Sequence, residues 1–466
     1  MLPLGGCLLS ADKPDPALDI PQAYGRGPQK PELADAAVPS LDWWRSFHSK
    51  ELTELIEEAR VANLDIAAAI AQIVQADAQA RVAGAPLLPA IAANGSATRA
   101  RPSQSLGSGL GSGGPSERND LTASLTASYE IDFWGKNRAA LRAAEETAVA
   151  SRYNREVVSL TTVVATANAY FQVLAAQDRL RIARENVASA SRILNLIRQQ
   201  FSAGTASDLN IAQQESLLNT QRASIPPLEE TLQQNQAALA LLIARPPERA
   251  IIRGGSMRAI AIPRVTPGLP SELLAQRPDI RQAEANLAAA NANVYNARAQ
   301  MLPSVTLTGE GGYESAVLKT LFRPESAFYT LTAGLTQPIF EGGRLQGNLD
   351  LQKGLQDQLL QNYRKAVISA FTDVDKALIA IRQTAQTERL QRDVVVSSRR
   401  AFELSEQQLR AGTLNLITLL QVQQTLFQAE DALSQTRLAR LQAIVSLYQA
   451  LGGGWLPKPV EASNAR

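Results

Sequence analysis

The sequence predicts an α+β membrane protein built on a duplicated plan, in which short amphipathic strands lead into very long helical hairpins. Three observations support this class. The short motif Asn63-Leu64-Asp65-Ile66 returns as Arg277-Pro278-Asp279-Ile280, and similar segments follow each copy in the same order. Four segments alternate between apolar and polar side chains, and neither glycine nor proline occurs in residues 136–203. A repeat of roughly 210 residues is too long for a solenoid unit, so it indicates two similar halves of one pseudo-symmetric object.

The strand segments follow a period of two, which places alternate side chains on opposite faces of a strand. From Leu121 to Phe133 apolar residues alternate with threonine, serine and acidic residues without a break. Residues 304–308 and 329–336 repeat the pattern, and 90–98 alternate more weakly, so two hairpins are predicted. A half-buried soluble sheet can show this alternation, but the hydroxyl-rich face suits a membrane barrel strand with water inside. Four strands cannot close a barrel, so several chains must share it.

Two long helical hairpins are predicted after the strands. Apolar residues recur at spacings of three and four along 136–203 and in the second half, which favours coiled-coil packing. Each helix should fold back at a Gly-Thr turn, at Gly204-Thr205 and at Gly412-Thr413, where glycine supplies backbone freedom. Pro226-Pro227 predicts a break in the first return arm. Ser434 stands at the equivalent position of the second arm, so the two hairpins should differ there.

The composition argues against several classes of function. Apolar residues make up 45% of the 466 residues, the net charge is +2 and no basic run occurs, so nucleic acid is not an expected partner. His48 is the only histidine and should lie at the surface, so a histidine metal cluster or a Ser-His pair is not expected. The sequence also has no Walker-type motif. We therefore expect no enzyme, no metal site and no cofactor. No run of 18 or more apolar residues occurs, so no membrane-spanning helix is predicted.

The single cysteine, Cys7, is a candidate site of lipid attachment. It follows Leu4-Gly5-Gly6, as in a bacterial lipobox, where small residues precede a cysteine that becomes lipidated. The alternative is a chance cysteine, because the charged segment and full apolar core of a signal peptide are missing upstream. We expect lipidation of Cys7, with the natural start of translation lying further upstream.

Several motifs together resemble the TolC-like outer-membrane factors, and more narrowly the lipoprotein branch that includes OprM and the NodT proteins. The most specific is the linker Gly268-Leu269-Pro270-Ser271-Glu272-Leu273-Leu274, which is followed by Arg277-Pro278-Asp279-Ile280. The other matching elements are Leu451-Gly452-Gly453-Gly454-Trp455, Trp43-Trp44, and Gly412-Thr413 with Leu419-Leu420. The resemblance extends over nearly the whole chain.

The resemblance implies a homotrimer whose four-stranded contributions form a twelve-stranded transmembrane β-barrel, continued by an α-helical coiled-coil barrel in the periplasm. The implied function is an exit duct that passes drugs or other toxic small molecules from an inner-membrane RND-type pump and a periplasmic membrane-fusion adaptor to the outside. Leu8 after a lipidated Cys7 suggests sorting to the outer membrane. A type I protein-secretion duct and a non-pore periplasmic coiled-coil scaffold are the alternatives.

On this plan the chain divides into five parts. They are a truncated signal peptide with lipobox (1–7), an N-terminal lead-in and equatorial segment (8–62), a first repeat (63–270), a second repeat (271–455) and a C-terminal tail (456–466). In each repeat a helix, a β-hairpin and a long helical hairpin follow one another.

The two turns are the expected tip of the tunnel and the expected contact with the adaptor. This assigns the adaptor contact to Gly204, Thr205, Gly412 and Thr413. A turn at the end of a helix of roughly 100 Å is the part that can reach across a periplasm.

The gate should lie beside these turns, and two kinds of closure remain open. Relatives carry an acid in a Thr-Leu-Leu-Asp pattern after the second turn, where this chain has Gln421, so that ion pair is absent. Asp208 and Arg410 could form a polar latch instead, or Leu414 and Ile417 could close the pore by apolar packing. Asp208 is equally consistent with a helix N-cap after the first turn.

Overall fold

The computed structural model describes residues 40–101, 117–250, 252–265 and 273–455. The chain divides into two compact units, each assembled from both halves of the repeat. The first unit contains Gln72–Ser151 and Ala283–Tyr363, and the second contains Arg152–Gln282 and the described residues of Ala17–Ala71 and Arg364–Arg466. Cys7, the lead-in up to residue 39, residues 266–272 of the linker and the tail 456–466 lie outside the described residues.

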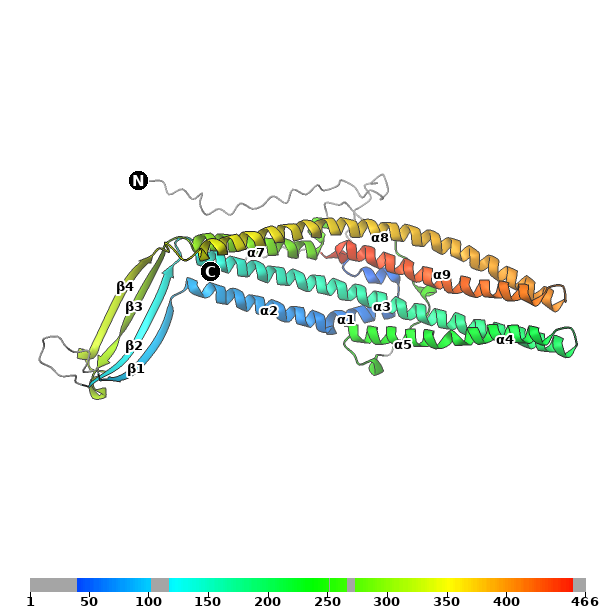
Figure 1. Ribbon diagram of the computed structural model, residues 1–466, viewed down its shortest axis with the longest axis horizontal. Coiled ribbons are helices and arrows are strands. Elements are labelled where there is room, and N and C mark those ends of the chain that lie inside the picture. Colours follow the sequence, from blue (N-terminus) through cyan, green and yellow to red (C-terminus); the bar gives the residue numbers. More distant parts are fainter. Residues whose placement is uncertain (1–39, 102–116, 251, 266–272, 456–466) are drawn as a thin grey trace. The chain divides into compact units, whose positions relative to one another are not determined.

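The first unit contains one antiparallel sheet in the order β1-β2-β3-β4 (Figure 1). Its strands are β1 (Ala90–Ala100), β2 (Arg118–Ile131), β3 (Ser304–Ser315) and β4 (Ala327–Thr336). Two strands come from each half of the repeat, which confirms the two predicted hairpins. The pairing of β2 with β3 joins the halves into one sheet.

The strand register separates apolar from polar side chains, as the alternation predicts. Leu125 lies opposite Gly311, and Leu331 lies opposite Gly309 two residues away on β3, so both leucines share one face. Leu125 is 60% exposed and Leu331 is 80% exposed in the single chain. The opposite face carries hydroxyl, amide and acidic side chains: Asn94, Ser96, Thr126, Ser128, Glu130, Thr308, Glu310 and Thr332.

The sheet has two open edges and one uncovered apolar face. β1 and β4 each pair with one neighbour among the described strands. Open edges and large exposed apolar surfaces are liabilities in a water-soluble protein. Pairing with neighbouring chains would satisfy the edges, and lipid would cover the apolar face, as in a membrane barrel.

Four helices contribute to the first unit: α2 (Leu64–Gly84), α3 (Lys136–Ser202), α7 (Pro278–Ala299) and α8 (Arg344–Arg410). Amide side chains connect them. Asn296 on α7 donates to the Lys136 carbonyl at 2.7 Å, and Gln356 on α8 donates to Asn291 on α7 at 2.6 Å. Helix α7 is therefore bonded to both α3 and α8.

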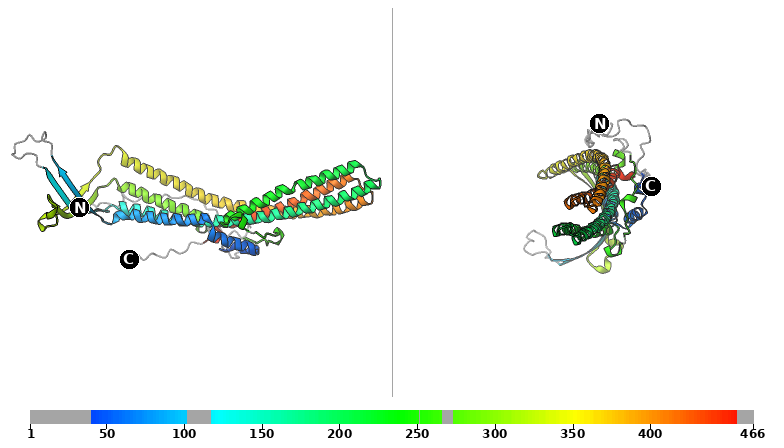
Figure 2. Two further views of the ribbon diagram at one scale, coloured as in Figure 1. Left: turned by 90° about the horizontal axis from the view of Figure 1, so that it is seen from below. Right: turned by 90° about the vertical axis from the view of Figure 1, so that its right-hand side faces the viewer.

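The second unit contains the two predicted helical hairpins. Helix α3 turns back into α4 (Asp208–Ala223) and α5 (Ile225–Leu242), and α8 turns back into α9 (Leu416–Ala450). Figure 2 shows the hairpins side by side, with both turns at the same end. The first return arm is interrupted at Ser224, two residues before Pro226, because proline lacks the N–H that a continuous helix needs. Helix α9 runs unbroken through Ser434, which confirms the predicted difference.

The core of the second unit is aromatic near helix α1 (Lys50–Ala62). The ring of Trp43 stacks on Tyr448 at 4.6 Å between centroids, and Phe47 lies 5.2 Å from Phe171. All four rings are buried. These contacts join the N-terminal segment to α3 and α9. His48, which follows Phe47, is exposed as predicted.

Helix α3 contains an 18-residue window with a mean hydropathy of 1.4, long and apolar enough to cross a membrane by composition. Polar residues interrupt this window, so it contains no uninterrupted apolar run of the kind on which the sequence prediction rested. However, 56% of the window is buried within the protein. Val163, Ala167 and Phe171 belong to the core of the second unit, which accounts for the apolar composition.

Short helices complete the described chain. They are α6 (Leu273–Gln276) and the 3-10 helices η2 (Trp43–Phe47), η3 (Ala85–Leu87), η5 (Pro247–Arg249), η6 (Met257–Ala259), η8 (Leu318–Thr320), η9 (Pro324–Ser326) and η10 (Gly452–Gly454).

Candidate channel surface and helical turns

The polar face of the sheet is the candidate channel surface. Ser124 donates a hydrogen bond to Glu310 across β2 and β3 at 2.8 Å, and Asn94 donates to Thr126 across β1 and β2 at 3.1 Å. These bonds satisfy polar groups laterally while the face stays hydrophilic. Such a face can line a water-filled passage for hydrated solutes.

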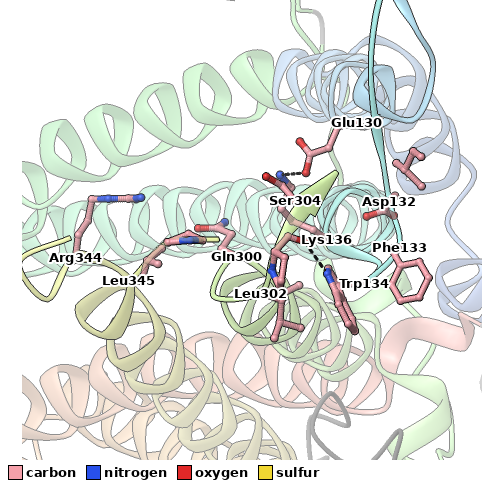
Figure 3. Close-up of a pocket in the computed structure, with 14 residues that line it drawn as sticks. Glu130, Asp132, Phe133, Trp134, Lys136, Gln300, Leu302, Ser304, Arg344 and Leu345 are labelled. Carbon is pink, nitrogen blue, oxygen red and sulfur yellow. Dashed lines mark hydrogen bonds and ion pairs between the residues drawn. The ribbon is translucent and has the colours of Figure 1, made fainter. Parts of the chain in front are cut away.

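A cavity of about 270 Å³ lies where the sheet meets the helices (Figure 3). Lys136 at the start of α3 forms an ion pair with Glu130 at 2.5 Å, and the Trp134 indole N–H donates to the Pro303 carbonyl at 2.7 Å. Each contact fixes the junction between β2 and α3, and the second reaches the start of β3. Among the described residues, no group of three or more His, Cys, Asp or Glu side chains is arranged to hold a metal ion.

Asp132 differs from its predicted role. The alternation placed Asp132 and Phe133 in the strand, but β2 ends at Ile131. The Asp132 carboxylate accepts the backbone N–H groups of Asn137 at 2.9 Å and Arg138 at 3.0 Å. It therefore satisfies unpaired donors at the start of α3, and an acid just before a long helix is the sequence signal for this role.

The two Gly-Thr turns have the same backbone geometry. Gly204 and Gly412 both have φ of 73°, in the left-handed region that favours glycine. The Thr205 N–H donates to the carbonyl of residue 200 at 2.9 Å, and the Thr413 N–H donates to that of residue 408 at 2.9 Å. This six-to-one bond is the Schellman ending of a helix. The sequence prediction of two hairpin turns is confirmed, and their contact with an adaptor remains a prediction.

The charged gate candidates are not brought together. Arg410 forms an ion pair at 2.6 Å with Glu406, one turn back on the same helix. Asp208 is the first residue of α4, and the N-cap is Ser207, whose backbone N–H bonds to Asn210. The N-cap interpretation of Asp208 is therefore wrong by one position. No ion pair between Asp208 and Arg410 occurs within the described chain.

The apolar gate candidates have different environments. Leu414 is half-buried and packs against an apolar cluster shared by α3, α8 and α9, whereas Ile417 is 55% exposed. Gln421 is exposed on the first turns of α9. The buried members of the cluster are Ile193, Ile197, Phe402, Leu409, Leu416, Leu419, Leu426 and Phe427.

A buried charge cluster in α8 and α9 was not predicted. The Glu388 side chain is 1% exposed and accepts hydrogen bonds from Arg437 at 2.9 Å and Arg440 at 2.8 Å. Burial alone would raise the pKa of Glu388, but these guanidinium groups hold that pKa below its ordinary value. Arg437 also donates to the Met257 carbonyl at 2.9 Å, so the cluster attaches the segment after α5 to the second hairpin.

The motif that starts at Arg277 and the motif Leu451-Gly452-Gly453-Gly454-Trp455 meet in the second unit. Arg277 donates to Asp373 on α8 at 3.3 Å and to the carbonyl of Ala450, the last residue of α9, at 3.2 Å. A Cβ at Gly452 would lie 2.2 Å from the Gln276 carbonyl oxygen, so a side chain there would collide with the backbone. The motifs therefore lock the start of α7 to the end of α9.

Comparison with known proteins agrees with this architecture. The family model described as outer membrane efflux protein matches residues 55–245 and 269–453. The chain is 42% identical over 458 residues to the pyoverdine export outer membrane protein OpmQ of Pseudomonas putida, covering 98% of this chain and 97% of that protein. It is 31% identical over 463 residues to the toluene efflux pump outer membrane protein TtgC of the same species, covering 99% and 95%.

Solved structures show the same fold. The CmeC outer membrane channel of Campylobacter jejuni has a TM-score of 0.87 at 27% identity, covering 96% of each chain. The open state of the MtrE outer membrane channel of Neisseria gonorrhoeae has a TM-score of 0.83 at 28% identity, covering 95% of this chain and 97% of that one. The chain therefore belongs to the outer membrane efflux protein family, the TolC-like outer-membrane factors whose trimers form the channel of tripartite efflux systems.

Proposed function

We propose that three copies of this chain form an exit duct that receives cargo from an inner-membrane RND-type pump through a periplasmic adaptor. The polar sheet face carries the proposal, because it supplies the hydrophilic side of a barrel whose other side is apolar and exposed. No reaction step is assigned to the chain. Conductance of the purified trimer in a planar bilayer tests the duct; a trimer that inserts without conductance would contradict it.

The proposed cargo is a drug or another toxic small molecule. Export of a siderophore is a second candidate, because proteins that are 42% and 41% identical to this chain carry the name of pyoverdine export. Deleting the gene for this chain, and measuring both drug tolerance and secreted siderophore, separates the two candidates. Loss of drug tolerance without a change in secreted siderophore supports the first, and the reverse result supports the second.

The adaptor contact is proposed at Gly204, Thr205, Gly412 and Thr413. The turns that contain these residues lie at one end of the paired hairpins (Figure 2). Cysteine replacements at Thr205 and Thr413 should cross-link to an adaptor that carries a cysteine at its own tip. Equal cross-linking from a cysteine that replaces Lys50, on helix α1, would contradict this location.

Closure of the gate is proposed to be apolar rather than ionic. Arg410 already has a partner on its own helix, and Gln421 has no charge to offer. Leu414 contacts the apolar cluster beneath the turns, and Ile417 is exposed beside it, where a neighbouring chain can cover it.

Lipid attachment at Cys7 is also proposed, with the lipobox-like Leu4-Gly5-Gly6 in support. Labelling with a radioactive fatty acid tests it in cells that express the gene with its native upstream region. Equal label on the wild type and on Cys7→Ser would contradict the anchor. The Cys7→Ser protein should still form trimers, because the barrel has its own affinity for the membrane.

A further inference from the structure

An exposed apolar loop joins β3 to β4 at the end of the sheet that lies away from α7. It spans residues 316–326 and contains the short helices η8 and η9 (Figure 1). Val317 is 57% exposed, and Leu318 and Phe322 are each 70% exposed. Three large apolar side chains on one short loop form a patch that marks an interaction surface.

Hydrogen bonds hold this loop in one conformation. The hydroxyl oxygens of Ser315 and Thr320 are 2.6 Å apart, and the Val317 N–H donates to the Ser315 hydroxyl at 3.2 Å. The Ser326 hydroxyl donates to the Thr320 carbonyl at 2.8 Å. Leu321 is 6% exposed, so one apolar side chain anchors the loop from within. The loop is therefore built to present its exposed side chains.

The apolar surface of the loop continues the apolar face of the sheet. Tyr313 lies opposite Ala123 on β2, which places it on the face that carries Leu125. The ring of Phe322 packs edge-on against Tyr313 at 5.6 Å between centroids. Phe322 therefore lies on the lipid-facing side of the sheet and not on the side that carries Glu310 and lines the passage.

Each of the two most exposed apolar side chains in the loop has a cation beside it in the sequence. Lys319 follows Leu318, and Arg323 follows Phe322, and both cations are exposed. Neither has an ion-pair partner within the described part of the chain. With Glu325 as its only acid, the loop has a net charge of +1. Basic side chains beside apolar ones are the pattern that binds anionic headgroups while the apolar groups enter the acyl region.

We propose that residues 316–326 form a lipid-binding lip, which enters the outer leaflet and binds the phosphate groups of an acylated glycolipid there. This inference rests on the proposed function: with the helices of the duct on the periplasmic side, the strand ends away from α7 face the cell exterior. Continuity with the lipid-facing sheet surface and the two cations favour this occupant. Two alternatives compete with this occupant. A second copy of the chain could cover the loop, or the loop could lie over the mouth of the pore.

Binding of lipid A tests the proposal. The purified trimer, in nanodiscs of phosphatidylcholine, is titrated with fluorescent lipid A. Lys319→Gln with Arg323→Gln should raise the Kd about 30-fold, because one basic side chain at an anionic membrane surface contributes about fivefold, or about 1 kcal/mol. The matched control, Lys50→Gln with Arg253→Gln, removes the same charge from the second unit and should leave the Kd unchanged.

Four outcomes would overturn the proposal. One is an unchanged Kd in the Lys319→Gln, Arg323→Gln variant. Another is equally tight binding of phosphatidylglycerol, which would show that any phosphate headgroup suffices.

The other two outcomes concern the apolar side chains. Leu318→Ser with Phe322→Ser should weaken lipid A binding yet leave trimer melting in detergent unchanged. Lower melting there would assign the patch to a neighbouring copy, and a higher single-channel conductance would place it over the pore mouth.

Discussion

Gly204 and Gly412 end the two longest helices in the same left-handed conformation, with φ of 73° at each. The residue after each glycine bonds to the carbonyl four positions before the glycine, so the whole helix ending is duplicated. The space around both glycines is open, because an added Cβ would meet no atom within 4 Å. The requirement for glycine at these turns therefore comes from the backbone and not from crowding.

Gly412→Val should abolish efflux while trimer formation and membrane insertion persist. A branched side chain in the left-handed region costs about 1–3 kcal/mol, so the turn would change conformation. The turn belongs to the second unit and the sheet to the first, so the strands should fold unchanged. Drug accumulation assays and trimer bands in unheated gels measure the two effects.

Gly354→Ala is the matched control for Gly412→Val. Gly354 lies within α8, and an added Cβ would again meet nothing within 4 Å, but its backbone is helical. Alanine should stabilise the helix by about 0.5–1 kcal/mol and leave efflux unchanged. If Gly354→Ala abolished efflux as fully as Gly412→Val, the special role of the turn would be lost.

Leu125→Arg should reduce the yield of trimer far more than Thr126→Arg. Leu125 lies on the exposed apolar face and Thr126 on the polar face, directly beside it in β2. An arginine facing lipid near mid-bilayer costs about 2–4 kcal/mol, while a substitution on the wet side mainly alters the passage. Thr126→Arg should instead change single-channel conductance. Equal trimer yields from both variants would refute the strand register.

The strands and hairpins were predictable because local sequence patterns determine them. The alternation around Leu125 fixes which side chains share a face, whatever the neighbouring strand is. Pro226 separates α4 from α5 through its own missing N–H, and Gly204 and Gly412 satisfy a local backbone requirement. The end of β2 was predicted too late, because the alternation continues through Asp132 after the backbone has left the sheet.

Long-range partners were not predictable from one sequence. Glu388 binds arginines 49 and 52 positions away, and nothing in the helical period distinguishes it from an exposed glutamate. Asp208 and Arg410 flank equivalent turns, yet Arg410 pairs with Glu406 on its own helix. Nearby turns do not by themselves bring particular charges into contact, since side-chain direction and a closer competitor decide the pair.

Glu388→Gln should destabilise the protein at neutral pH by about 3–5 kcal/mol, because it leaves two partly buried guanidinium groups without their buried counter-charge. The pKa of Glu388 lies below its ordinary value of 4.5 in the fold. Its stabilisation is therefore fully present above pH 4.5, and is lost as the pH falls from there through the lowered pKa. The difference in Tm between wild type and variant should shrink across that interval.

The exposed Glu185 supplies the control for Glu388. Its side chain is 61% exposed and pairs with Arg181 on the same helix. Glu185→Gln should change stability by less than about 1 kcal/mol. If Glu388→Gln had an equally small effect at neutral pH, the buried cluster would not stabilise the attachment of Met257 to α9.

Ser434→Pro should unfold α9 locally and destabilise the protein by about 3 kcal/mol or more. Ser434 is 7% exposed in an unbroken helix, whereas Pro226 at the equivalent position stands at the start of α5. Circular dichroism and thermal melting measure the loss. Ser434→Ala is the control and should be close to neutral, because it removes a hydroxyl that makes no hydrogen bond within the described chain.

Leu414→Ser should raise the conductance of the closed channel, whereas Asp208→Ala and Arg410→Ala should leave it nearly unchanged. Leu414 packs into the apolar cluster beneath the turns, so a polar replacement weakens the packing that holds the hairpin ends together. Arg410 loses only its exposed pair with Glu406, which is worth less than about 1 kcal/mol. Planar-bilayer recordings at fixed salt compare the three variants. A leak in Arg410→Ala or Asp208→Ala as large as in Leu414→Ser would show instead that charges between neighbouring chains latch the gate.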